Sequence, residues 1–221
     1  MNRPTMRAFV AAALATLGAS GCAASGGGAA PAAAPAAAPA PAARAGAAQE
    51  RRANPADVHF MSGMIHHHAQ ALVMAEMSET HGANSQIRTL SERIHVSQTD
   101  EIGLMQRWLA DMGEPVPEAT AGPMRMTMGG MEHEMLMPGM LTPEQMAELG
   151  AARGGDFDRL FLTYMIQHHE GALTMVGELF DSYGGGVDDF VYKFASDAFA
   201  DQGAEIDRMQ RMLEAMGPGE R

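Results

Sequence analysis

An internal repeat constrains the fold of this 221-residue chain more than any other feature. A segment near residue 65 recurs 101 residues later, and a segment near residue 105 recurs 104 residues later. The first segment comprises Phe60, Met64, Ile65, His67, His68, Ala71, Leu72 and Met74, with counterparts Phe161, Met165, Ile166, His168, His169, Ala172, Leu173 and Met175. The second comprises Gln98, Glu101, Ile102, Met105, Gln106, Leu109, Met112 and Gly113, with counterparts Gln202, Glu205, Ile206, Met209, Gln210, Leu213, Met216 and Gly217. Two similar helical hairpins of this kind pack naturally into one pseudo-symmetric four-helix bundle.

The spacing of apolar residues predicts which parts of the chain are helical. Long stretches place apolar side chains on one helical stripe and end at Gly or Pro, which predicts helices over 57–81, 85–112, 156–183 and 187–216. Asn54-Pro55 has the residues of a helix start, and Thr142 to Gln145 reads as a capping box that opens a short helix to about 151. Since no segment shows sustained strand alternation, we expect an all-α fold with a Met-rich connecting loop.

The N-terminal residues have the pattern of an export signal. Arg3 and Arg7 precede an apolar run over 8–18 that is too short for a membrane span, and small residues lead to Cys22. This pattern resembles a bacterial lipoprotein signal in which Cys22 becomes the lipidated residue, the alternative being an ordinary cleaved signal. We therefore expect a signal over 1–21, an Ala/Pro-rich tether over 22–53, and a folded domain over 54–221 with a Met-rich insertion at about 114–141.

The composition excludes some partners and points to others. The formal net charge is −12, so binding to nucleic acid is disfavoured. There are 21 Met and one Cys, so disulfides play no part in the fold, and Met thioethers are the abundant soft ligands.

Paired histidines are the strongest chemical feature. Each half of the repeat carries two adjacent His residues with a Met one helical turn earlier, on a shared face. Neighbouring helical residues project about 100° apart, so the two rings of a pair point in different directions. Four imidazoles near one bundle axis need hydrogen-bond partners or a metal ion. The resulting candidate ligands are Met64, His67, His68, Met165, His168 and His169.

The second helix of each hairpin adds a Glu and, four residues later, a Met on the same face. Glu101 with Met105 and Glu205 with Met209 are therefore candidates to complete a metal site or to hydrogen-bond a His ring. The alternative is a solvated helix surface for the Glu and ordinary core for the Met.

The connection between the hairpins is unusually rich in Met. Residues 124–140 contain seven Met, interrupted by Gly129, Gly130, Pro138 and Gly139, so the segment is a poor helix. Thioether sulfur suits Cu(I), and imidazole suits both copper states. The candidate ligands in this connection are Met126, Met128, Met131 and His133, the alternative being a linker or an apolar contact surface.

A di-iron oxidase is the main competing chemistry. Such bundles need a Glu-x-x-His from each of two helices. Glu92 and His95 satisfy the motif once, but their counterparts are Ser196 and Phe199. The ferritin-like oxidase reading is therefore disfavoured.

Several motifs together resemble a known family. They are Asp57 to Met61, Met64 to His68, Pro138 to Thr142, Phe157-Asp158 and Met165 to Ala172. These segments are similar to those of domain-of-unknown-function family 305, which includes CopM-type copper-binding proteins of the bacterial periplasm. The resemblance spans residues 55–217 and implies a ferritin-like four-helix bundle, copper binding, and the six Met and His residues of the paired motifs as ligands.

The sequence therefore predicts an exported copper-binding protein, periplasmic or anchored in the outer membrane, that sequesters copper or passes it to or from another envelope protein. Two alternatives stay open: a metal-dependent oxidase, and an envelope interaction module that binds no metal. An oligomer is compatible with the Met-rich surface.

Overall fold

The computed structural model describes residues 52–217, and the fold of this part is mostly helical. The predicted signal segment, Cys22 and nearly all of the predicted tether lie outside the described residues. The helices are α1 Pro55–Thr80, α2 Ser85–Asp111, α3 Pro143–Ala151, α4 Gly154–Asp181 and α5 Asp189–Ala215. None of the helices in this range combines the length and the hydropathy that a membrane span requires.

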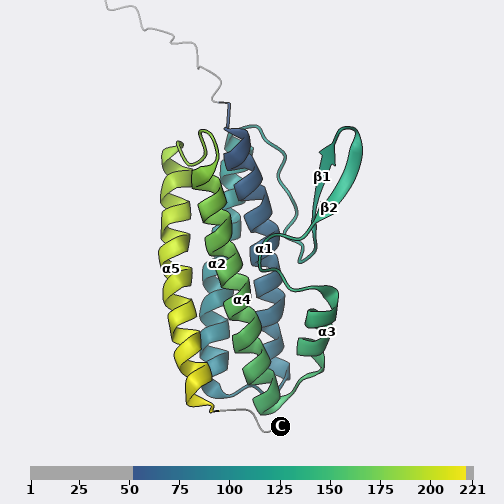
Figure 1. The fold of residues 1–221 in the computed structure, drawn as a ribbon, viewed down its shortest axis with the longest axis vertical. Helices are drawn as coiled ribbons and strands as arrows, with labels where there is room; N and C mark the ends of the chain where they lie inside the picture. The colour runs from purple at the N-terminus through teal and green to yellow at the C-terminus, as the bar shows by residue number, and fades with distance from the viewer. Residues whose placement is uncertain (1–51, 218–221) are drawn as a thin grey trace, which may run out of the picture. The chain divides into compact units, whose positions relative to one another are not determined.

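The four long helices pack side by side (Figure 1). Helix α1 packs against α2, α4 packs against α5, and α1 also contacts α4. The two helices that carry the paired histidines are therefore neighbours. Short α3 contacts both α1 and α4 on the outside of the bundle.

Side-chain capping explains where α1, α2, α3 and α5 begin. The Asn54 side chain accepts a hydrogen bond from the backbone N–H of Ala56 at 2.8 Å, with Pro55 in the first turn. Thr142 and Gln145 form the reciprocal bonds of a capping box at α3, which confirms that prediction. Asn84 and Asp188 cap α2 and α5 in the same way through their side-chain oxygens.

The prediction of an irregular loop is wrong for residues 124–135. Strands β1 Met124–Met128 and β2 Met131–Met135 form an antiparallel hairpin in which Met128 pairs with Met131 and Met124 with Met135. Gly129 and Gly130 make the two-residue turn with φ of 61° and 82°, and this positive-φ conformation matches the twist of a hairpin. The two Gly residues therefore form the turn of a β-hairpin.

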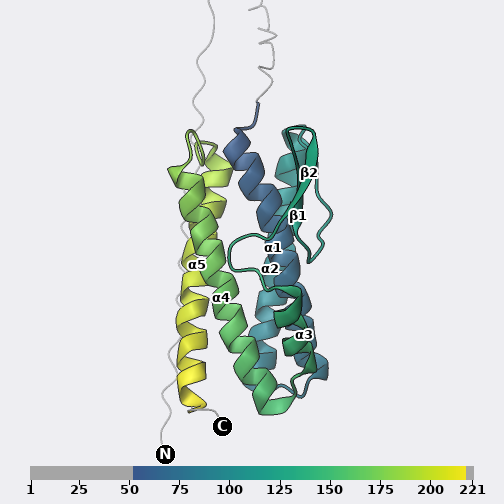
Figure 2. The ribbon, with the colours of Figure 1, turned by 45° about the vertical axis from the view of Figure 1, so that its right-hand side comes forward.

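The chain after the hairpin crosses the bundle at the junction of α1 and α4 (Figure 2). We call residues 136–142 the crossing segment. Gln70 of α1 holds it through two hydrogen bonds, because its amide donates to the Leu141 carbonyl at 3.0 Å and its Oε1 accepts from the Leu141 N–H at 2.6 Å. Gly171 of α4 allows this approach, since a Cβ there would overlap the carbonyl of Pro138.

Candidate metal centre

The first histidine of each pair faces its counterpart across the bundle. The ring centroids of His67 on α1 and His168 on α4 are 3.7 Å apart, with an interplanar angle of 38°. Both side chains are completely buried. The internal repeat thus places two equivalent imidazoles in contact at the junction of the two hairpins.

The crossing segment fixes the protonation of one of these rings. His67 Nε2 lies 3.0 Å from the carbonyl oxygen of Pro138. A carbonyl only accepts hydrogen bonds, so Nε2 carries the proton and donates it. In the neutral ring, Nδ1 is then left with a free lone pair, which is the form of imidazole that ligates a metal.

The second histidine of each pair points to a carboxylate on the next helix. His68 Nε2 donates to Glu101 Oε2 at 2.6 Å, and His169 Nε2 donates to Glu205 Oε2 at 2.6 Å. A carboxylate that holds one ring nitrogen orients the imidazole and leaves Nδ1 unprotonated in the neutral ring, as in carboxylate–histidine–metal arrangements. Of the three roles that the sequence left open for these Glu residues, namely metal ligand, hydrogen-bond partner of a His ring and solvated helix surface, the geometry matches hydrogen bonding to His.

The remaining ring nitrogens are buried without partners. Within residues 52–217, five of the eight nitrogens on the four histidines make no hydrogen bond. They are Nδ1 of His67, His68, His168 and His169 and Nε2 of His168. Each unsatisfied buried polar atom costs about 1–3 kcal/mol, so the cluster is destabilising as it stands unless a ligand satisfies it.

Electrostatics keep the central rings neutral. Burial, together with the charges of His68 and His169, lowers the pKa of His67 to about 3. Burial and the charge of His67 lower the pKa of His168 well below its usual range. Burial alone would raise the pKa of Glu101, but its hydrogen bond to His68 and that ring's charge outweigh burial and hold the pKa below its usual value.

The predicted thioether ligands are buried near the histidines along each helix. Met64 and Met165 lie one turn before His67 and His168, on the faces that those rings share, and both are fully buried. Met105 of α2 is buried in the same core cluster as Met64, and Met209 of α5 in the same cluster as Met165. Each half of the repeat thus buries thioether side chains as well as imidazoles.

The predicted ligands of the Met-rich connection lie elsewhere. Met131 and His133 are exposed on β2, and the backbone register pairs Met126 with His133 and Met128 with Met131. The side chains of Met126 and Met128 are outside the described part of the structure. The exposed side chains of Met131 and His133 are therefore separate from the four buried histidines.

Nitrogen and oxygen ligands alone do not complete a centre. Across the described residues, no three His, Cys, Asp or Glu side chains are placed to hold one metal ion together. The buried Met thioethers are the further donors in this region, and thioether sulfur suits a soft ion such as Cu(I).

Sequence reasoning missed two contributors to this region. One is the Pro138 carbonyl that binds His67, which is a backbone atom without a side-chain signal. The other is Met137, which is buried beside Gly63 of α1. The sequence did contain one signal for this crossing, in Pro138, Gly139 and Gly171. Gly residues allow two backbones to approach closely, and the structure places these three residues at such a contact.

Comparisons with known proteins identify the family to which the chain is similar. The family model for a domain of unknown function, DUF305, matches residues 57–213. No curated protein matches the chain.

Solved structures resemble the chain over most of its length. A DUF305 protein from Streptomyces coelicolor, named as a candidate secreted protein, is 29% identical with a TM-score of 0.61, over 75% of this chain and 96% of that one. A DUF305 fragment from Deinococcus radiodurans is 28% identical with a TM-score of 0.61, over 74% and 99%. CopM in its Cu(I)-bound form is 25% identical with a TM-score of 0.55, over 73% and 98%.

Proposed function

This chain belongs to the DUF305 family of domains of unknown function, and from that premise we propose that its helical domain binds copper at the contact between His67 and His168. The protein then acts as a binding protein that sequesters copper or hands it on. Copper is its cargo rather than a catalytic cofactor.

One observation carries this proposal. Five buried imidazole nitrogens lack partners within the part of the chain that the structure describes, and three of them are Nδ1 atoms left free because Nε2 donates elsewhere. Folding a chain with so many unsatisfied nitrogens is costly, and a metal ion would recover that cost. The donor set of neutral imidazole and thioether fits copper.

The relatives support the choice of metal. CopM has been solved with Cu(I), with Cu(II) and with silver bound. Silver(I) is a soft ion like Cu(I), so both would use thioether sulfur. The four buried Met residues Met64, Met105, Met165 and Met209 are the proposed sulfur ligands beside the histidines.

We further propose that the protein is exported and lipid-anchored through Cys22. The basic, apolar and small-residue pattern before Cys22 supports this, and one DUF305 relative is named as a candidate secreted protein. The ferritin-like character of the bundle, and exchange of copper with another envelope protein, belong to the same proposal.

An oxidase would need a different ligand set. A carboxylate-bridged di-iron centre uses Glu from all four helices. Here Glu101 and Glu205 each hold a histidine from the neighbouring helix, and no three nitrogen or oxygen ligands among residues 52–217 converge. Binding without turnover is therefore the function that this geometry favours.

A competitive Cu(I) titration tests the proposal. The full chain and a His168→Phe variant are titrated with Cu(I) buffered by a chromophoric chelator. Phe keeps a planar ring and removes only nitrogens that have no partner in the described structure, so the bundle should fold. We expect the variant to lose at least tenfold in affinity, whereas equal affinity would refute copper binding at the His67–His168 contact.

A further inference from the structure

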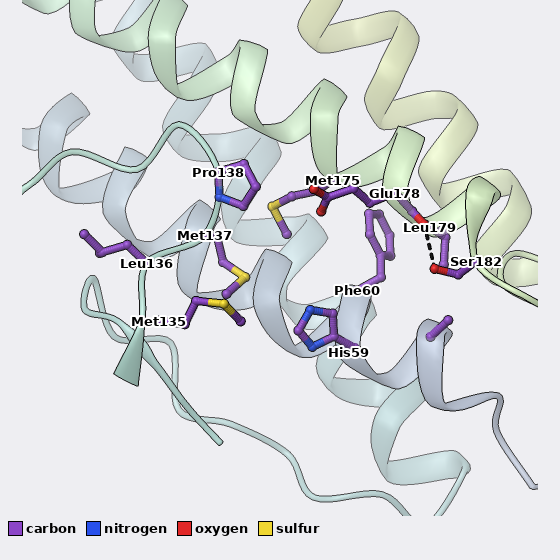
Figure 3. A pocket seen from close by; sticks show the side chains of 11 residues that line it. His59, Phe60, Met135, Leu136, Met137, Pro138, Met175, Glu178, Leu179 and Ser182 are labelled. Carbon is purple, nitrogen blue, oxygen red and sulfur yellow. Dashed lines mark hydrogen bonds between the residues drawn. The ribbon is translucent and has the colours of Figure 1, made fainter. Parts of the chain in front are cut away.

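A pocket of about 300 Å³ opens beside the buried histidines, between α1, α4 and the end of β2 (Figure 3). Its soft and nitrogen donors are His59 of α1, Met135 of β2, Met137 of the crossing segment and Met175 of α4. Figure 3 shows the three thioether side chains directed into this space and the imidazole of His59 bordering it. We call it the outer pocket.

Two of the Met side chains that line the outer pocket lie close to Gly63 of α1. Met137 Sδ lies 2.7 Å, and Met175 Cε 3.4 Å, from the point where a Cβ of Gly63 would stand. Both Met side chains are buried, at 4% and 5% exposure, so their sulfurs are sheltered from bulk water. Because Gly63 has no side chain, the side chains of Met137 and Met175 can occupy this space.

The mouth of the outer pocket is accessible. Met135 is 42% exposed, and His59 and Glu178 are exposed at the rim. The imidazole of His59 makes no hydrogen bond with any residue that the structure describes, so it is available to a ligand. The carboxylate of Glu178 adds negative charge where a cation would enter.

The outer pocket is not a consequence of the internal repeat. The counterpart of His59 is Leu160, and the counterpart of Met175 is Met74, which is buried in the other core cluster. Met135 and Met137 come from the connection between the hairpins and have no counterpart. The set of donors in the outer pocket therefore occurs once in the described structure and is independent of the repeated His and Met motifs.

The outer pocket also adjoins the buried histidines through consecutive residues. Met137 lines its floor, and the next residue, Pro138, accepts the hydrogen bond from His67. An ion bound by Met137 would therefore be held by the residue directly before Pro138, whose carbonyl orients the ring of His67.

We propose that the outer pocket is a second binding site, for a soft monovalent cation such as Cu(I), and that it receives the ion before it reaches the buried histidines. Three thioethers and one imidazole form a donor set for Cu(I) rather than for a hard cation. The second part of this inference, that the ion then reaches the buried histidines, rests on the proposed copper function. The first part does not, because the outer pocket can bind an ion whether or not the buried site does.

Titration of the full chain with Ag(I), a redox-inert probe, tests this proposal. The test variant is Met135→Leu with Met175→Leu, which removes sulfur at nearly constant volume. The matched control is Met146→Leu with Met74→Leu, since Met146 lies on α3 outside both proposed sites and Met74 is the repeat counterpart of Met175. His168→Phe reports on the buried site separately.

We expect two Ag(I) ions to bind the wild type and the control, and one of the two to weaken at least tenfold in the test variant. Identical titrations of test variant and control would overturn the outer site. If His168→Phe keeps both ions while the test variant loses one, the proposed buried site fails and the outer site stands.

A second measurement needs no substitution at the site. With ¹³C-labelled Met methyl groups, substoichiometric Ag(I) should shift the resonances of Met135, Met137 and Met175 before those of Met64 and Met165. Shifts that begin at Met64 and Met165, with the three outer methyl groups unchanged, would contradict an entry site.

Discussion

His67 of α1 and His168 of α4 place their imidazole rings 3.7 Å apart in the buried centre of the bundle. His67 has one hydrogen bond, to the Pro138 carbonyl, and neither nitrogen of His168 has a partner among residues 52–217. A packed core rarely retains polar atoms in this condition without a function.

Replacing His168 with Phe should separate stability from binding. The change removes two unsatisfied nitrogens, each of which costs about 1–3 kcal/mol, and no hydrogen bond of the described structure, so the free energy of unfolding of the metal-free protein should rise, by up to about 6 kcal/mol. The rise in Tm that copper causes should be smaller in the variant than in the wild type, because only the outer pocket would still bind the ion. Thermal unfolding with and without Cu(I) measures both quantities, and an equal copper-dependent rise in the two proteins would contradict the account.

The metal-free protein should lose stability in acid. The pKa of His67 is lowered to about 3 and that of His168 lies well below 6.5, whereas both rings would titrate near 6.5 in the unfolded chain. Between these values the unfolded state binds more protons, so the stabilising contribution is complete above pH 6.5 and falls as pH decreases toward 3.

Each of the two rings should add a slope of up to about 1.4 kcal/mol per pH unit to the free energy of unfolding. Urea unfolding at a series of pH values from 7.5 to 4.5 measures the slope, and His168→Phe should make it shallower. The same slope in wild type and variant would show that His168 is not held neutral by the fold.

Adding a methyl group at Gly171 should displace the crossing segment. A Cβ there would overlap the Pro138 carbonyl, which binds His67, so Gly171→Ala should destabilise the fold by about 1–3 kcal/mol. Gly177→Ala on the same helix is the control. Its Cβ would meet nothing within 4 Å, and Ala is the better helix former, so it should be neutral or stabilising by up to about 1 kcal/mol. Equal urea midpoints for both variants would contradict the close crossing.

Changing Glu205 to Gln should weaken copper binding without removing a proposed ligand. The carboxylate accepts from His169 Nε2 at 2.6 Å and orients that ring, and loss of such a partner costs roughly 10–100-fold in metal affinity. Glu214→Gln, at an exposed position of the same helix, should leave affinity unchanged. Chelator competition compares the two variants, and equal affinities would remove Glu205 from the site.

Helices and caps followed from sequence because their signals are local. The spacing of apolar residues repeats within each helix. The capping residues Asn54 and Thr142 lie directly before the helices that they begin. The hairpin was missed because Met is not typical of strands, and the alternation of Met with polar residues around Gly129-Gly130 is short.

The site was predictable in outline and not in detail. The repeat predicted that His67 and His168 occupy equivalent helical positions. It did not predict that the first His of each pair meets its counterpart while the second reaches a Glu, because that division depends on the rotation of each helix in the bundle. The outer pocket was also hidden, since Met135, Met137 and Met175 meet only through the path of the crossing segment.

Diffraction from crystals of the full chain loaded with Cu(I), collected on both sides of the copper absorption edge, tests the central claim most directly. The account predicts an anomalous peak within coordination distance of a ring nitrogen of His67 or His168. Copper peaks confined to other residues, with none at these two rings, would contradict it.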